Sequence, residues 1–335
     1  MRTLVIIATV ILACAWGVCR AAENTVLRLG FETPRTDSQF LAAAKFAELV
    51  RERTGGAVNV KLYPDSVLGS GSAMLAAVRS GDLDMYLGGS GYFANFAQRL
   101  NLVDIPFLFR DYSHVDAVLT GPVGDAMLGE LEAFDLKGLA FFENGFRCLS
   151  NNIRPVRSAG DASGLKIRTL DNPMHLETWR RLGAVVMPMP LSNLYVALES
   201  RTVDGQEHPL GVVFSARLYE VQRYISMTNH VYSPLILAMN EQRHARFPEA
   251  VRAALRQSAR EAADFQKQYN RDNLAKQLRR MANAGCEIIP PGEIDIRSFV
   301  DILGSVTREM YLSDYGGPLG QAWLDAIDAE SDDGR

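Results

Sequence analysis

The stretch that decides the fold runs from residue 164 to residue 209. It opens with Gly164-Leu165-Lys166-Ile167-Arg168 and closes with Val203-Asp204-Gly205-Gln206-Glu207-His208-Pro209. Arg168 directly follows an apolar strand signal, and the ends of sheet strands are where open α/β folds place small-molecule sites. Arg147, in Asn144-Gly145-Phe146-Arg147, follows another strand signal. Two guanidiniums that converge on one cleft can hold a carboxylate or a phosphate, because each presents a planar fork of donors. The alternative is that both arginines form structural ion pairs or lie on the surface.

The rest of the chain alternates between strand and helix patterns. Residues 40–53 carry apolar side chains with the helical period, and Gly55-Gly56 ends that pattern. Such alternation predicts an α/β protein with largely parallel sheets covered by helices. Strands are expected at 26–31, 58–63, 83–87, 138–142, 164–169 and 184–187, with further helices at 73–79, 115–131 and 174–182.

The longest uninterrupted helical pattern covers residues 248–282. A continuous helix of this length would extend for about 50 Å, which is too long for one small lobe. The chain, at 335 residues, also exceeds the size at which one hydrophobic core stops growing. We therefore expect two lobes with this helix as a strut between them; two shorter helices with a kink are the alternative.

The first 21 residues have the features of an export signal. Arg2 supplies a positive charge, residues 4–18 are almost entirely apolar, and Cys19-Arg20-Ala21 offers a cleavage site. The apolar core is shorter than the roughly 20 residues that span a bilayer. We predict a cleaved signal peptide at 1–21 and a periplasmic protein, with a lipid anchor at Cys14 as the alternative.

Charge and cysteine content exclude several classes of partner. The formal net charge is −4 and the charges are interspersed, so neither nucleic acid nor an anionic membrane surface is an expected partner. Cys148 and Cys286 remain after export, each beside a strand signal, which favours buried free thiols over a disulfide. No CxxC spacing or paired histidines occur, so no metal or cofactor is expected.

The polar run before Pro209 is unusual for a solvated loop. His208 could donate a hydrogen bond to a bound anion, and more strongly if protonated; a purely structural histidine is the alternative. Asp204 and Glu207 could form an acid/base pair, although capping or turn roles fit them better. The run Gly88-Gly89-Ser90-Gly91 lacks the spacing and lysine of a phosphate loop and is expected to form a tight turn beside a cleft.

A set of short motifs follows one order along residues 26–299. They include Leu62-Tyr63-Pro64, Gly81-Asp82-Leu83-Asp84-Met85, Gly145-Phe146-Arg147, Gly164-Leu165-Lys166-Ile167-Arg168, Pro188-Met189-Pro190, Tyr195-Val196-Ala197-Leu198 and Val203-Asp204-Gly205-Gln206-Glu207. In order and spacing the chain resembles the solute-binding proteins of TRAP (tripartite ATP-independent periplasmic) transporters, the DctP family.

The resemblance implies an extracytoplasmic receptor, and the absence of a nucleophile motif also favours a binding protein over an enzyme. It implies two α/β lobes, at residues 22–145 with 234–273 and at 146–233 with 274–325. The lobes would close on a small organic acid anion and deliver it to membrane subunits driven by an ion gradient. It also implies that Arg168 pairs with the ligand carboxylate and that Arg147 lines the site.

The chain departs from the family pattern in ways that bear on its ligand. His208 stands where the family usually has asparagine, and Glu32 replaces a short polar residue of the sialic-acid branch. Gly89 and Leu191 also differ from that branch. We therefore expect a smaller organic acid or sugar acid, with Glu32 reading a hydroxyl group. The aromatic side chains expected to line the cleft, or else to pack in the core, are Tyr92, Phe93 and Tyr232.

Three functions remain open at this point. The leading hypothesis is a monomeric periplasmic receptor for an organic acid. The others are an exported α/β enzyme that uses Asp204, Glu207 and His208 as acid/base groups, and a ligand sensor for a membrane signalling protein. A phosphate ester is the alternative ligand.

Overall fold

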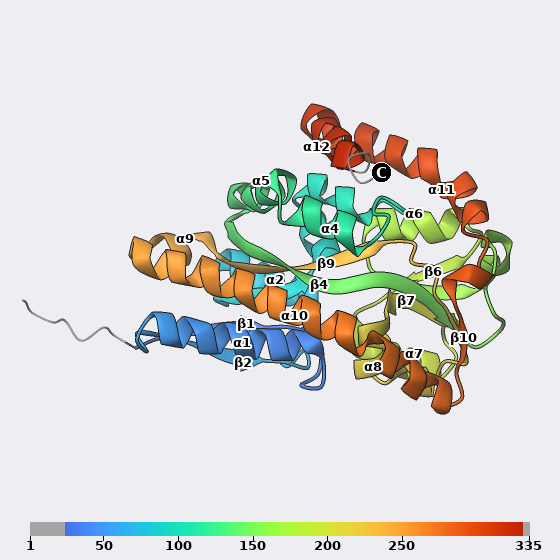
Figure 1. Cartoon of the computed structure of the whole chain (residues 1–335), viewed down its shortest axis with the longest axis horizontal. Coiled ribbons are helices and arrows are strands. Elements are labelled where there is room, and N and C mark those ends of the chain that lie inside the picture. Colours follow the sequence, from blue (N-terminus) through green and yellow to red (C-terminus); the bar gives the residue numbers. More distant parts are fainter. Residues whose placement is uncertain (1–23, 331–335) are drawn as a thin grey trace, which may run out of the picture.

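The computed structural model describes residues 24–330 (Figure 1). The predicted signal peptide and the alternative lipid anchor at Cys14 lie outside the described residues. Within them, no helix combines the length and the apolar character needed to cross a membrane.

The first lobe contains the beginning of the chain and a strand that returns to it much later. Strands β1 and β2 pair in parallel, as do β1 and β3, whereas β9 runs antiparallel to β3. The predicted β-α-β start is therefore confirmed, but the strand at residues 232–240 was not predicted. These elements are β1 (Thr25–Gly30), α1 (Ser38–Arg53), β2 (Val58–Tyr63), α2 (Gly71–Ser80), β3 (Met85–Gly89), α3 (Ser90–Ala94), β9 (Tyr232–Asn240) and α9 (Glu241–Ala245).

The second lobe contains the stretch from residue 164 to residue 209. Strand β5 pairs in parallel with both β6 and β7, while β7 runs antiparallel to β4. The polar run before Pro209 is thus a fully buried strand and not a loop, because its polar side chains find partners on neighbouring strands. These elements are β5 (Lys166–Thr169), α6 (Pro173–Arg181), β6 (Val185–Pro188), α7 (Leu194–Glu199), β7 (Gly205–Pro209), α8 (Leu210–Ser215), β8 (Tyr224–Ser226) and β10 (Glu287–Ile289).

Strand β4 (Leu136–Asn151) runs through both lobes and joins the two halves of the sheet (Figure 1). Residues 136–146 pair with β9 and residues 147–151 pair with β7. All these pairs are antiparallel, so the expectation of largely parallel sheets is wrong for the centre of the molecule. Arg147 also lies inside this strand and not at a strand end, because the chain continues directly from one lobe to the other.

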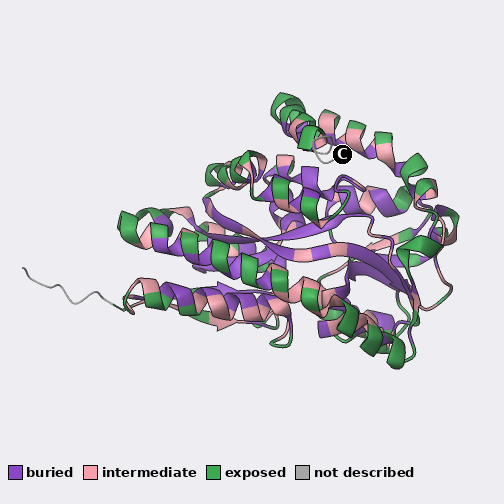
Figure 2. Cartoon of the chain, in the orientation of Figure 1, coloured by how far each residue is buried: buried purple, intermediate pink, exposed green. Residues whose placement is uncertain are grey.

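The predicted strut is confirmed as one unbroken helix, α10 (Glu249–Asn283). Leu255 and Ala259 pack in a core of the first lobe, and Met281 packs in a core of the second. Figure 2 shows the exposed outer face of α10 and the buried strands beneath it.

The predicted single helix at 115–131 is instead two helices, α4 (Tyr112–Leu119) and α5 (Pro122–Glu130). Pro122 occupies the first turn of α5, where its missing N–H needs no partner, but inside a longer helix it would break the hydrogen-bond ladder.

The end of the chain crosses from the second lobe to the first. Helix α11 (Ile296–Tyr311) packs Phe299 and Leu303 in a second-lobe core, whereas α12 (Gly317–Glu330) packs Trp323 and Leu324 in a first-lobe core. The lobe boundaries expected from the sequence, including the end of the second lobe at residue 325, stay a prediction. Cys148 and Cys286 are buried free thiols, as predicted.

Candidate ligand-binding site

A cavity of about 50 Å³ lies between the two lobes. Glu32, Gly89 and Tyr92 line it from the first lobe, and Leu191 does so from the second. The cavity is also lined by three side chains that the sequence analysis predicted to bind a ligand, namely Arg147, Arg168 and His208.

Tyr232 is not brought to this cavity. Its ring packs edge-on against Phe109 and Phe146, with centroids 5.8 and 5.2 Å away, and it lines a separate cavity of about 250 Å³ between α4, β4 and α10. Successive side chains of a strand point to opposite faces, so Ser233 faces the site instead. Phe93 is likewise buried in the first-lobe core.

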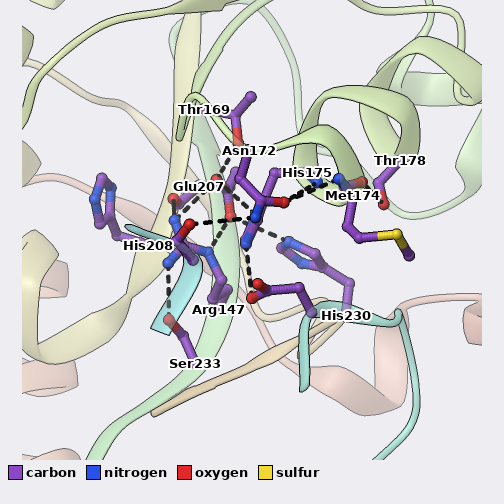
Figure 3. Close-up of polar contacts among 12 residues, drawn as sticks. Arg147, Thr169, Asn172, Met174, His175, Thr178, Glu207, His208, His230 and Ser233 are labelled. Atoms are coloured by element: carbon purple, nitrogen blue, oxygen red, sulfur yellow. Dashed lines mark hydrogen bonds and ion pairs between the residues drawn. The ribbon is translucent and has the colours of Figure 1, made fainter. Parts of the chain in front are cut away.

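Arg147 is held by Glu207 (Figure 3). Its Nε donates to Glu207 Oε2, and Nη2 donates to Oε1 at 2.8 Å and to the Glu207 carbonyl oxygen at 2.6 Å. Nη1 donates to Ser233 Oγ at 3.2 Å. Burial alone would raise the pKa of Glu207, but Arg147, His175 and His230 lower it well below its ordinary value. The pair is therefore ionised and largely neutralises itself.

Further polar side chains surround Glu207 and fix its carboxylate. Thr169 Oγ1 donates to Oε1 at 2.5 Å, and His230 Nε2 lies 3.4 Å from Oε2. His175 joins Glu207 to Asp104, with 3.0 Å between His175 Nε2 and Asp104 Oδ1. Burial lowers the pKa of His175, but the two carboxylates raise it above its ordinary value.

Asp204 takes no part in the cavity. Its carboxylate accepts a hydrogen bond from the backbone N–H of Lys166 at 2.8 Å. The second lobe thus places Asp204 in a capping role and Glu207 in an ion pair, which gives no acid/base pair facing the cavity.

Arg168 is buried without an acidic partner among the described residues. Nε and Nη2 donate to the Met189 carbonyl oxygen at 2.9 and 2.5 Å, and Nη1 lies 3.2 Å from His208 Nε2. Burial lowers the pKa of Arg168, because desolvation disfavours the charged form. A buried cation with only neutral partners is a strong attractor for an anion.

Glu32 faces the arginines from the first lobe. Tyr92 Oη donates to its Oε1 at 3.1 Å and Tyr86 Oη to its Oε2 at 3.4 Å. Burial raises the pKa of Glu32, although the Gly71 N–H, Tyr92 and Arg168 oppose this shift. A Cβ on Gly71 would lie 2.5 Å from Glu32 Oε2, so glycine is needed for this close approach.

Several lining residues were missed by the sequence analysis. Asn144 belongs to the motif that ends in Arg147, so its position alone could have indicated it. Thr33, Gln39 and Ser233 carry no local signal. Thr33 follows β1, Gln39 lies in the first turn of α1 and Ser233 lies on β9, and only the tertiary fold brings them to one cavity.

The structure shows a two-lobed α/β protein with a cavity between the lobes that two arginines line. Residues 29–314 match the model of the DctP family, described as bacterial extracellular solute-binding protein, family 7. The chain belongs to this family, which confirms the resemblance found in the sequence.

Similar proteins agree with this assignment. The chain is 43% identical over 302 residues to the 2,3-diketo-L-gulonate-binding periplasmic protein YiaO of Escherichia coli (strain K12), covering 90% of this chain and 91% of that protein. A TRAP periplasmic solute-binding protein from Polaromonas sp. JS666, solved with D-erythronate, has a TM-score of 0.87 at 32% identity, covering 91% and 98% of the two chains. The sugar acid binding protein DctPAm from Advenella mimigardefordensis, solved with galactonate, has a TM-score of 0.87 at 27% identity, covering 92% and 99%.

The protein is therefore a solute-binding protein of the TRAP type. Its family and structural neighbours are substrate-binding proteins of small organic acid anions.

Proposed function

We propose that this protein captures a hydroxylated monocarboxylate of the sugar-acid class in the periplasm and delivers it to TRAP membrane subunits. The observation that carries the proposal is the opposition, across one cavity, of an unpaired buried guanidinium, Arg168, and a buried carboxyl group, Glu32. To bind both groups, a ligand must have an anionic end for Arg168 and an end that donates hydrogen bonds to Glu32.

The place of the ligand's anionic end follows from the N–H donors of Arg147 and Arg168 that have no acceptor within the described residues. A guanidinium has five N–H donors. Arg168 uses one on each of Nε, Nη1 and Nη2, so it keeps one on each Nη. Arg147 keeps a single N–H on Nη1. The adjacent pair on Arg168 suits the two oxygens of a carboxylate, and Arg147 supplies a third donor.

The donating end is assigned from Glu32. In its ionised form, which the Gly71 N–H, Tyr92 and Arg168 favour, the Glu32 carboxylate only accepts hydrogen bonds. It then favours ligand hydroxyl groups and disfavours a second carboxylate, whose charge it would repel. The ligands named for the three relatives are all hydroxylated monocarboxylates, which supports the same class for this chain.

Binding would favour the closed arrangement of the lobes. Arg147, Arg168 and His208 belong to the second lobe and Glu32 to the first, so one ligand touches both only when they are close. A ligand with more contacts in the closed state shifts the equilibrium toward that state. We further propose that the protein acts as a monomer without catalysis, after removal of its signal peptide.

Isothermal titration of the full mature chain tests the ligand class. We expect D-erythronate or 2,3-diketo-L-gulonate to bind at least about tenfold more tightly than succinate or glycerol 3-phosphate, because like charges across a buried site cost several kcal/mol. Tighter binding of succinate or of the phosphate ester would overturn the assignment of Glu32.

The variant Arg168→Ala tests the anchor. We expect it to weaken binding by about 100-fold or more while circular dichroism stays unchanged, because the ligand carboxylate loses its charged fork. Arg297→Ala, on the exposed face of α11, is the matched control and should bind like wild type. Retained affinity in Arg168→Ala would contradict the proposal.

A further inference from the structure

A chain of five hydrogen-bonded side chains leads from the cavity to Gln222, which lines a separate pocket of the second lobe. It runs from Arg168 through His208, Gln206 and Ser150 to Gln222. The exposed fraction of each residue is 7% or less. Because buried polar groups are generally hydrogen-bonded, the donors and acceptors along this chain are expected to follow one consistent direction.

The far end of this chain sets the direction of its hydrogen bonds. Gln222 Nε2 donates to the carbonyl oxygens of Val221 and Asp204, at 3.0 and 3.4 Å, so its Oε1 faces Ser150. Ser150 Oγ donates to that oxygen at 2.9 Å and therefore accepts from Gln206 Nε2 at 2.8 Å. This leaves Gln206 Oε1 facing His208 Nδ1.

The near end sets the same direction independently. Arginine has donors and no acceptor, so Arg168 Nη1 must donate to His208 Nε2, 3.2 Å away. The hydrogen of a neutral imidazole then has to be on Nδ1, where Gln206 Oε1 accepts it. Carbonyl oxygens at one end and a guanidinium at the other thus require one tautomer of His208.

We propose that His208 is a positioning residue, which holds the Arg168 guanidinium by accepting a hydrogen bond at Nε2 in the Nδ1–H tautomer that Gln206 imposes. The inference rests on the proposed function in that Arg168 binds the ligand carboxylate. It assigns His208 the opposite role to the one predicted from the sequence, since its Nε2 accepts from Arg168 and does not donate to the anion.

The charges around His208 support the neutral imidazole. Arg168 on β5, Arg147 on β4 and His175 on α6 disfavour a second proton, and Glu207 on β7 favours it. Burial and the two arginines hold the pKa of His208 well below its ordinary value. The electrostatics therefore favour the same neutral imidazole that the hydrogen bonds require.

Nitrogen-15 NMR of the ligand-free mature protein tests the tautomer, with the His208 signals assigned by their loss in His208→Leu. We expect a protonated Nδ1 and an unprotonated Nε2, unchanged from about pH 5 to 8. An Nε2–H tautomer, or a ring that gains a proton in that range, would overturn the inference. This result needs no ligand, so it stands apart from the test of the proposed function.

Titration with D-erythronate tests the positioning role. We expect His208→Leu to weaken binding by about 10- to 100-fold, the effect of one hydrogen bond to a charged group. His208→Gln, whose side-chain oxygen can stand where Nε2 stands, should recover most of this loss. Wild-type affinity in His208→Leu, or no recovery in His208→Gln, contradicts the role.

Gln206 provides a second variant that leaves the cavity untouched, because it is not among the lining residues. Gln206→Leu removes the acceptor of the Nδ1 hydrogen, so we expect a mixture of tautomers and weaker binding, by about 3- to 10-fold. A single Nδ1–H tautomer with unchanged affinity would show that Gln206 does not impose it. Loss of binding in Arg168→Ala is expected in either case.

Discussion

Arg147 and Arg168 line the same cavity from the second lobe, but their surroundings differ. Arg147 forms a buried ion pair with Glu207 and donates to Ser233. Within residues 24–330, Arg168 donates only to the Met189 carbonyl oxygen and to the imidazole of His208. The guanidinium of Arg147 is thus neutralised by its ion pair, whereas that of Arg168 has no ion-pair partner among the described residues. From this difference in partners we expect Arg147 to act mainly in the structure and Arg168 to contribute most to the proposed binding of the anion.

The largest effect should follow from breaking the Arg147–Glu207 pair. We expect Glu207→Ala to lower the free energy of unfolding by about 3–5 kcal/mol, because it leaves Arg147 buried and unpaired. Urea denaturation measures this loss. The double variant Arg147→Met with Glu207→Leu should recover much of it, since it leaves no buried charge. An equal or greater loss in the double variant would contradict this account.

The opposite result is expected for the other arginine. Arg168→Met should raise the free energy of unfolding by about 0.5–2 kcal/mol, as removal of a strained functional group often does, while binding is lost. Urea denaturation and titration of the same preparation measure both. If Arg168→Met destabilised the protein as Glu207→Ala does, the contrast between the two arginines would fail.

Glu32 should produce a smaller, pH-dependent effect. Its pKa is raised by burial above 4.5, so the folded state binds the proton more tightly than the unfolded state. This contribution to stability is present below pH 4.5 and is lost as pH rises through the folded pKa. We therefore expect the free energy of unfolding of wild type, relative to Glu32→Gln, to fall over this range. A difference that is constant with pH would show that Glu32 is not buried as described.

Ser233→Ala should have the smallest effect. It removes one hydrogen bond from Arg147, whose ion pair with Glu207 remains, so we expect a loss of about 1 kcal/mol or less. Thermal unfolding measures it. A loss as large as that of Glu207→Ala would show that Ser233, and not Glu207, holds Arg147.

The sequence predicted the elements with local periodicity and the residues with local motifs. The helix at 248–282 was found almost to its ends, because thirty-five consecutive residues carry one pattern. Arg168 was found because it follows an apolar strand within a family motif. The break in the helix at 115–131 was also visible in the sequence, since Pro122 follows Gly121.

Pairings between distant strands could not be predicted in the same way. Gln206, Glu207 and His208 have the composition of a loop. Their burial depends on partners such as Arg147, Ser150 and Arg168, which stand 40 to 60 residues away. Tyr232 was expected at the cavity because the strand that contains it was not predicted, and so neither was the face on which its side chain lies. The partner of Arg147 was missed for the same reason, and with it the difference between the two arginines.

Strand β4 connects the lobes without an intervening loop, and this has a mechanical consequence. Its pairing with β9 shifts register between Glu143 and Gly145, beside the point where the strand passes to the second lobe. Gly145 there has a φ of 114°, a conformation that glycine adopts without strain. A bulge bends and twists a strand locally while the flanking hydrogen bonds persist. We therefore expect the lobes to separate by elastic bending of a continuous sheet. Such bending would be opposed by a restoring force toward the closed arrangement, so the ligand would have little strain to overcome when the lobes close.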